Sequence, residues 1–269
     1  MGAAILTVDD LRVDFELPGR TVHAVRGVSF EVRAGRTLAI VGESGSGKSA
    51  TASSVLRLNP EPPARYPSGL ISYQGRDVLR LSQKELRSIR GDEIAMVFQD
   101  PMSSLNPVRR IGAQIAEVLC RHRGGRAARY HADVVAALEA AGIDDPQRRA
   151  AQYPHELSGG LRQRAMIAMA LVAGPRLLIA DEPTTALDVT VQAQILDVLA
   201  GLQQDRQMAL LLITHDLGVV ANMADDVLVM RAGEVVEHGD VLSILTNPKH
   251  PYTRQLLAAT PRLREESPA

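Results

Sequence analysis

The residues from 42 to 49 have the types and spacing of a loop that binds phosphate. Their sequence, Gly42-Glu43-Ser44-Gly45-Ser46-Gly47-Lys48-Ser49, fits the pattern G-x-x-x-x-G-K-[ST], between an apolar strand and a helix. The glycines let successive backbone N–H groups face an anion, and the helix start adds partial positive charge. Lys48 would then contact the β- and γ-phosphates, and the Ser49 hydroxyl would ligate Mg²⁺. The alternative is a glycine-rich turn with a chance Lys-Ser pair, which the flanking elements disfavour.

Two adjacent carboxylates follow a second apolar run. Leu177-Leu178-Ile179-Ala180 leads into Asp181 and Glu182, which places both at the carboxyl edge of a sheet, where doubly wound folds bind ligands. Asp181 is suited to hold Mg²⁺ through water, and Glu182 to polarise an attacking water as general base. Alone, the pattern is more often a helix cap. The phosphate-binding loop upstream favours the catalytic interpretation.

A second helix start that could face an anion lies at Ser158, Gly159 and Gly160. Ser158 is a good N-cap, and the two glycines leave the first helical N–H groups open. A plain helix cap would have the same sequence. An enzyme that acts on one mononucleotide needs one phosphate cradle, so a second one indicates that a site is shared with another copy.

These residues need a sheet to position them, and the second half of the chain supplies one. Strands are expected at 37–41, 94–98, 177–180, 209–213 and 227–230, and helices at 47–58, 82–90, 189–202 and 217–223. Helices that alternate with short apolar strands predict a parallel sheet covered on both faces.

Two other segments have a different character. Residues 5–8, 11–15 and 28–32 alternate as short strands around a turn at 17–20. Residues 100–174 form an all-helical insertion, with apolar residues at helical spacing over 111–119, 132–141 and 158–173 and a basic loop over 121–129.

Composition excludes several classes of protein. The 269 residues contain 30 Lys plus Arg and 31 Asp plus Glu, a net charge of −1 that disfavours nucleic acid as a partner. The chain has one cysteine, Cys120, which rules out an internal disulfide or a Cys₄ metal site and fits a reducing, cytosolic setting. Because no apolar run approaches about 18 residues, we expect membrane association through partners only.

Taken together, residues 42–49, 157–163 and 177–182 resemble the Walker A, signature and Walker B motifs of ABC-transporter ATPases, in that order. The resemblance covers nearly the whole chain. It implies an α/β P-loop NTPase (RecA-like) core, an N-terminal antiparallel β subdomain and an inserted all-helical subdomain. The nucleotide-binding core would span 1–99 and 175–246, the helical subdomain 100–174, and a short C-terminal motif and tail 247–269.

The resemblance also implies further site residues. Gln99 matches the Q-loop glutamine, which ligates Mg²⁺ and water and senses the membrane partner, and His215 matches the switch histidine at the γ-phosphate. Ala186-Leu187-Asp188 resembles the D-loop, which crosses the dimer interface. Phe15 has the position of the aromatic residue that stacks on adenine, with a core phenylalanine as the alternative; His23 is a weaker candidate nearby.

The resemblance thus implies three overlapping groups of site residues: catalytic, Mg²⁺-binding and ATP-binding. The catalytic set is Glu182, His215, Lys48 and Gln99, and the Mg²⁺ set is Ser49, Gln99 and Asp181. The ATP-binding set is Phe15, Gly42, Glu43, Ser44, Gly45, Ser46, Gly47, Lys48, Ser49 and Ala50, with Ser158, Gly159, Gly160 and Asp188 acting in trans.

Two segments indicate a group within the family. Residues 99–107 resemble the Q-loop, and residues 247–253 the C-terminal motif, of ATPases that serve oligopeptide, dipeptide and nickel importers. The implied protein hydrolyses ATP at the cytoplasmic face of the cell membrane. Its partners would be two transmembrane permease subunits, a second ATPase subunit (a paralogue or an identical copy) and, indirectly, an extracellular solute-binding protein.

Two alternatives compete with this function. One is a soluble ABC ATPase of DNA repair or translation, which the single uninterrupted cassette disfavours. The other is a nucleotide-binding subunit that does not hydrolyse, which Glu182, His215 and Lys48 argue against.

The loop after Gln99 carries the last expectation. Met102 and Leu105 are apolar in a segment framed by Pro, Ser and Asn. We expect them to be exposed and to form a docking groove for a short partner helix. The alternative is that both pack onto the helical block.

Overall fold

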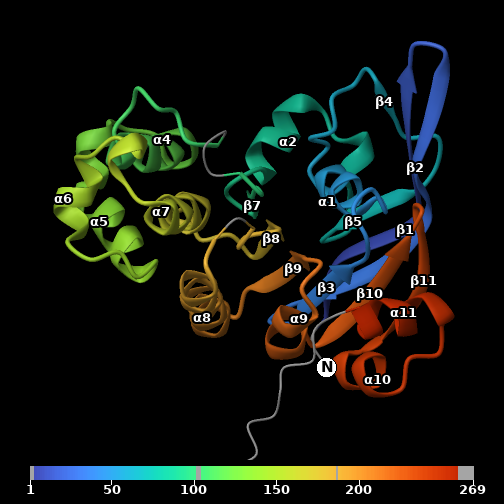
Figure 1. Ribbon diagram of the computed structural model, residues 1–269. Helices are drawn as coiled ribbons and strands as arrows, with labels where there is room; N and C mark the ends of the chain where they lie inside the picture. The colour runs from blue at the N-terminus through green and yellow to red at the C-terminus, as the bar shows by residue number, and fades with distance from the viewer. Residues whose placement is uncertain (1–2, 101–103, 186, 260–269) are drawn as a thin grey trace, which may run out of the picture.

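A parallel sheet forms the centre of the molecule (Figure 1). The computed structural model describes residues 3–100, 104–185 and 187–259. The strand order is β11-β10-β3-β9-β8-β7, with all neighbours parallel except β10 and β11. The strands are β3 (Thr37–Val41), β7 (Ile94–Val97), β8 (Leu177–Asp181), β9 (Ala209–Ile213), β10 (Asp226–Arg231) and β11 (Glu234–Asp240). Every residue of β3, β8 and β9 is buried, which explains their nearly continuous apolar sequences.

The N-terminal part forms a second, antiparallel sheet of order β2-β1-β5-β6, with β4 paired to β1. Its strands are β1 (Ala4–Leu17), β2 (Arg20–Arg33), β4 (Ala64–Arg65), β5 (Leu70–Tyr73) and β6 (Arg76–Asp77). The sequence predicts two strands here, but β1 is continuous. Its ladder to β2 shifts register between Val8 and Leu11, so the strand passes through a bulge without ending. This bulge accommodates Asp10, whose φ is 41° and whose N–H donates to Ser29 Oγ at 2.9 Å.

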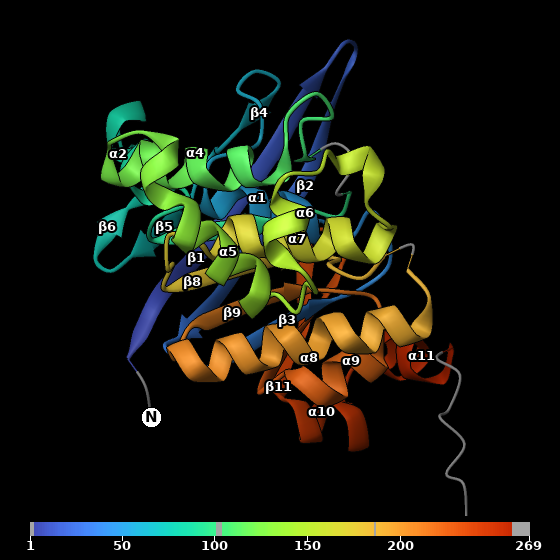
Figure 2. The same ribbon diagram turned by 90° about the vertical axis from the view of Figure 1, so that its left-hand side faces the viewer.

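Helices cover both faces of the parallel sheet, as predicted (Figure 2). Alternate residues of β3 point to opposite sides. Leu38 and Ile40 face the main core, which they share with helix α1 (Lys48–Val55) and the antiparallel sheet, whereas Ala39 and Val41 face helix α9 (Leu217–Met223). Helix α8 (Val189–Arg206) packs against β8 and β9 in a third cluster.

Helices alone build the segment from 111 to 171, at the left of Figure 1. They are α4 (Ile111–Arg123), α5 (His131–Ala140), α6 (Pro146–Ala150) and α7 (Gly159–Leu171), with 3₁₀ turns η2 (Ala127–Tyr130) and η3 (Pro154–Glu156). They share a core of their own. α4 extends three residues into the segment predicted as a basic loop, because Arg121, His122 and Arg123 suit the negative end of a helix.

Leu105 is not part of an exposed docking surface. It is 3% exposed and packs with Ile111 and Ile115 in the core of the helical segment. The expectation that Leu105 is available to a partner is therefore wrong, and its alternative, packing onto the helical block, is correct. Met102 lies outside the described residues.

The remaining elements flank the two sheets. They are η1 (Val78–Arg80), α2 (Gln83–Ile89), α10 (Val241–Thr246) and α11 (Pro251–Ala259). The tail from 261 onward lies outside the described residues. Within the described part of the chain, no helix combines the length and apolar character needed to span a bilayer.

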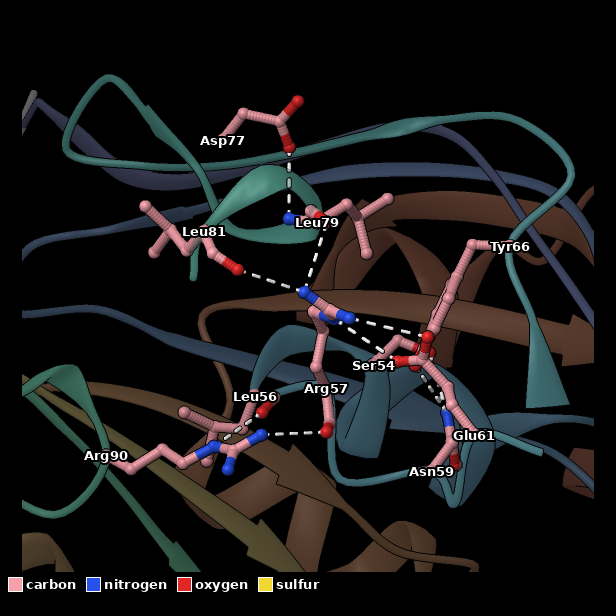
Figure 3. Close-up of polar contacts among 10 residues, drawn as sticks. All are labelled: Ser54, Leu56, Arg57, Asn59, Glu61, Tyr66, Asp77, Leu79, Leu81 and Arg90. Carbon is pink, nitrogen blue, oxygen red and sulfur yellow. Dashed lines mark hydrogen bonds and ion pairs between the residues drawn. The ribbon is translucent and has the colours of Figure 1, made fainter. Parts of the chain in front are cut away.

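Two arginines fix the C-terminal end of α1 (Figure 3). Arg90 donates from Nε to the carbonyl of Leu56 at 2.9 Å and from a terminal nitrogen to that of Arg57 at 2.8 Å. Arg57 in turn donates to the carbonyls of Leu79 and Leu81 and pairs with Glu61. Guanidinium groups at the open carbonyls of a helix end are stabilising. They tie α1 to the segment that leads into β7.

Candidate functional site

The phosphate-binding loop joins β3 to α1 and is lined by a buried lysine. Lys48 Nζ donates to the carbonyls of Gly42 and Glu43, each at 2.8 Å, and the residue is 5% exposed. Burial lowers the pKa of Lys48, against the opposing influence of Glu182, Asp181 and Glu43. The fold therefore holds a desolvated cation where a phosphate would sit.

Gly42 and Gly47 must be glycine because backbone carbonyl groups of neighbouring strands lie too close for a side chain. A Cβ at Gly42 would lie 2.2 Å from the carbonyl oxygen of Met230, and one at Gly47 would lie 2.4 Å from that of Ala24. Both glycines have positive φ, 152° and 100°. The N–H of Gly233 also donates to the Ser46 carbonyl at 3.0 Å. The loop thus lies between β2 and the β10–β11 turn, two neighbours that the sequence analysis did not identify.

Ser49 and Asp181 meet at the inner end of the loop. Ser49 Oγ donates to Asp181 Oδ1 at 3.1 Å, which joins the first turn of α1 to the end of β8. Asp181 is 7% exposed, and burial raises the pKa of its carboxyl. A hydroxyl beside a carboxylate is the kind of oxygen pair that Mg²⁺ takes. Among the described residues, no three His, Cys, Asp or Glu side chains are arranged to hold a metal ion by themselves, so such an ion would also need phosphate oxygens and water.

Glu182 is the centre of a polar cluster beside this pair. Its Oε2 accepts from Gln99 Nε2 at 3.0 Å and from Thr185 Oγ1 at 2.7 Å, and its Oε1 lies 3.3 Å from His215 Nδ1. Its backbone is strained, with φ of 48°, and its N–H donates to the Ile213 carbonyl. The structure brings Gln99, Glu182 and His215 together from three separate strand ends.

Thr185 is a member of this cluster that the sequence analysis did not select. Its hydroxyl donates to the carboxylate three residues earlier, within the turn after β8. Side-chain hydrogen bonds over three residues are common for threonine in turns. The three-residue spacing between Glu182 and Thr185 could therefore have indicated this hydrogen bond from the sequence.

Comparison with known proteins agrees with this geometry. A family model described as "ABC transporter" matches residues 25–185, and one described as "Oligopeptide/dipeptide transporter, C-terminal region" matches residues 236–268. The chain belongs to the ABC transporter family. As predicted, it is an ABC-type ATPase of the oligopeptide/dipeptide transporter group, and the fold class is confirmed.

Individual relatives of this ABC ATPase are longer than the chain. The oligopeptide transport ATP-binding protein OppD of Bacillus subtilis is 54% identical over 261 residues, which cover 96% of this chain and 72% of OppD. The dipeptide transport ATP-binding protein DppD of the same organism is 51% identical over 259 residues, with 96% and 77% covered. These relatives do not favour a role in DNA repair or translation.

A solved structure has the same architecture. The dimeric post-hydrolysis state of the ATP-binding cassette MJ0796, bound to ADP and Pi, superposes with a TM-score of 0.78 at 25% identity, covering 88% of this chain and 98% of that chain. The nucleotide in that structure supports ATP as the ligand of this family.

The residues predicted to act in trans lie at the starts of two helices, α7 and α8. Ser158 caps α7 by accepting from the Leu161 N–H at 3.4 Å, and Asp188 caps α8 by accepting from the Val191 N–H at 2.9 Å. Gly160 also has a packing role, since a Cβ there would lie 2.6 Å from Val191 Cγ1. Both cap side chains thus bond to the first turn of their own helix.

The predicted adenine-stacking residue lies on the N-terminal hairpin. Phe15 pairs with Val22 across the β1–β2 ladder and with Ala64 of β4, and it is partly buried against the main core. His23 Nδ1 lies 2.8 Å from Asp14 Oδ1. Stacking by Phe15 stays a prediction.

Proposed function

We propose that this chain hydrolyses ATP to power the import of peptides, or of a related solute such as nickel, as a peripheral subunit at the cytoplasmic face of the membrane. The carrying observation is the Glu182 carboxylate, which is hydrogen-bonded to Gln99 and Thr185 and lies close to His215. The transport names of OppD and DppD support the solute class.

Hydrolysis needs a base, a cation at the phosphates and an oriented water. Glu182 takes the proton of the attacking water, the water oxygen bonds to the γ-phosphorus, and the bond from that phosphorus to the ADP oxygen breaks. Lys48 and His215 stabilise charge on the γ-phosphoryl oxygens. Gln99 and Thr185, which both donate to Glu182 Oε2, hold the carboxylate in place.

Ser49 and Asp181 would hold Mg²⁺, with Gln99 as a further ligand. When bound, the ion neutralises charge on the β- and γ-phosphate oxygens. The hydrogen bond from the Ser49 hydroxyl to the buried Asp181 carboxylate supports this assignment.

A second ATPase subunit, identical or a paralogue, would complete each site. Ser158, Gly159, Gly160 and Asp188 would contact the nucleotide held by the partner's loop. The dimeric state of the MJ0796 cassette with ADP and Pi supports this arrangement.

An apolar groove beside Gln99 would receive the permease. It lies between β7 and helices α4 and α7 and is lined by Met96, Phe98, Met166 and Met169. Phe98 is 42% exposed and directly precedes Gln99, which contacts Glu182. An apolar segment of a transmembrane subunit in this groove would thereby be linked to the base. This groove replaces Leu105 as the proposed coupling surface.

The test of the proposed base is Glu182→Gln. The amide keeps the size of the side chain but cannot accept the proton, so ATP binding should persist while hydrolysis falls by about 10²–10⁴-fold. Glu117→Gln, at an exposed carboxylate paired with Arg109, is the matched control and should hydrolyse at the parent rate. Hydrolysis at the parent rate by the Glu182 variant would falsify the assignment.

A further inference from the structure

The C-terminal helix reaches the phosphate-binding loop. Tyr252, near the start of α11, accepts a hydrogen bond at its hydroxyl from the backbone N–H of Glu43 at 3.0 Å, although the two residues are 209 positions apart. Tyr252 is 2% exposed, and the guanidinium carbon of Arg231 lies 4.9 Å from its ring centroid. None of the motifs discussed above gives this tyrosine a role.

The contact lies where β3 turns into the loop. The Tyr252 ring shares a core cluster with Val41, and Glu43 is held at both of its backbone polar groups. Its N–H donates to Tyr252, while its carbonyl accepts from Lys48 Nζ at 2.8 Å. Tyr252 and Lys48 therefore both hold the backbone of the same loop residue, Glu43.

The turn before α11 is itself held in place. The Glu237 carboxylate of β11 accepts from the N–H groups of Lys249 at 2.7 Å and His250 at 3.1 Å. Arg254 donates back to the carbonyls of Pro248 at 3.0 Å and Lys249 at 3.1 Å. These bonds fix the position of the Tyr252 hydroxyl relative to the sheet.

We propose that Tyr252 is a positioning residue of the phosphate-binding loop, through which the C-terminal segment 248–254 sets the affinity for nucleotide. This inference rests on the proposed ATP site. Removal of the hydroxyl leaves the Glu43 N–H without its acceptor, so the loop loses the constraint that orients its backbone for phosphate.

Tyr252→Phe tests the hydroxyl alone, since the ring stays in its cluster and against Arg231. We expect a rise of about three- to tenfold in the KM for MgATP and in the Kd for ADP measured by calorimetry, with kcat within about twofold. Tyr130→Phe is the matched control. That tyrosine is also buried and donates one hydrogen bond to a backbone carbonyl, Gly124, but it lies in the helical segment.

The outcomes separate the inference from the proposed function. Parent-like KM and Kd in Tyr252→Phe, or an equal shift in Tyr130→Phe, would overturn the role of Tyr252 while the ATP site stands. Absence of ADP binding by the parent chain would instead overturn the ATP site.

A double-mutant cycle tests the route through the C-terminal segment. Glu237→Gln replaces one of the two acceptors with an N–H₂ group, so the turn before α11 should loosen and the Kd for ADP should rise by about two- to fivefold. In the Tyr252→Phe background the same change should add less than about 1.5-fold, because the link is already cut. Full multiplication of the two effects would overturn this route.

Discussion

At the residue scale, the burial of the Asp181 carboxyl lowers the stability of the folded protein at neutral pH. Because burial raises the pKa of this carboxyl, the folded state binds its proton more readily than the unfolded state. The free energy of unfolding therefore falls as the pH rises above the ordinary aspartate range, near pH 4. The proposed role of Asp181 in holding Mg²⁺ would account for an acid at this buried position.

Asp181→Asn should relieve this penalty. The amide oxygen can still accept from Ser49 Oγ, so we expect a Tm at pH 7.5 equal to or above that of the parent, with the difference shrinking as the pH falls toward 4. The same variant should lose the extra stabilisation that Mg²⁺ adds to ATP. Scanning calorimetry measures both effects, with the exposed Asp197→Asn as control. A Tm well below the parent at pH 7.5 would contradict the argument.

Thr185→Val tests how Glu182 is oriented. Valine keeps the shape of threonine but removes the donor that lies 2.7 Å from the carboxylate. We expect kcat to fall by about tenfold with little change in ATP binding, since one hydrogen bond to a charged group is lost. Thr185→Ser should restore most of the rate. Equal activity of the valine and serine variants would remove Thr185 from the mechanism.

The site was predictable from sequence where motif and strand coincide. The loop at 42–49 and the carboxylates at 181–182 follow buried apolar strands, so their placement follows from the sheet. The contacts of Tyr252 and Ala24 with the loop were not predictable. Ala24 lies in no motif, the C-terminal motif that contains Tyr252 indicates only a group within the family, and tertiary packing alone brings both to the loop.

At the element scale, the predicted strands differ from the observed ones where a strand contains polar residues. β1 was divided because Asp9 and Asp10 interrupt its alternation, and only the partner strand shows that a bulge absorbs them. β11 was missed because its residues are exposed or half-buried along one edge of the sheet, which leaves no apolar pattern to read. Strands buried on both faces were found without difficulty.

The helical segment and its groove give a prediction about two apolar residues. Leu105→Ala should cost about 2–5 kcal/mol of unfolding free energy, because it leaves a cavity in the core of α4–α7.

Phe98→Ser, at an exposed position, should leave the Tm within about 2 °C but abolish co-purification with the permease subunits. Parent-like assembly by the Phe98 variant would place the permease elsewhere.

At the scale of the whole molecule, one hydrogen bond joins the helical segment to the residue after Glu182, and another joins the end of β7 to Glu182 itself. Gln163 of α7 donates to the Pro183 carbonyl, next to Glu182, and Gly160 packs against Val191 of α8. Gln99 reaches Glu182 from the groove side. Under the proposed function, these contacts would let a permease and a second ATPase both act on the carboxylate that lies close to His215.

The shared site can be tested at Ser158, because substitutions can distinguish its role as the N-cap of α7 from its proposed contact with a partner's nucleotide. Aspartate and asparagine are both good N-caps, so either substitution keeps α7 capped, but only aspartate adds a negative charge where a partner's γ-phosphate would lie. In the Glu182→Gln background with MgATP, we expect Ser158→Asn to form the closed dimer and Ser158→Asp to remain monomeric, as measured by light scattering. Both should bind ATP as monomers, because the Ser158 side chain bonds within its own helix, to the Leu161 N–H. If the pairing is with a paralogue, the same contrast should appear in the mixed sample. Dimers of equal stability from both variants would show that α7 does not face the nucleotide of a partner.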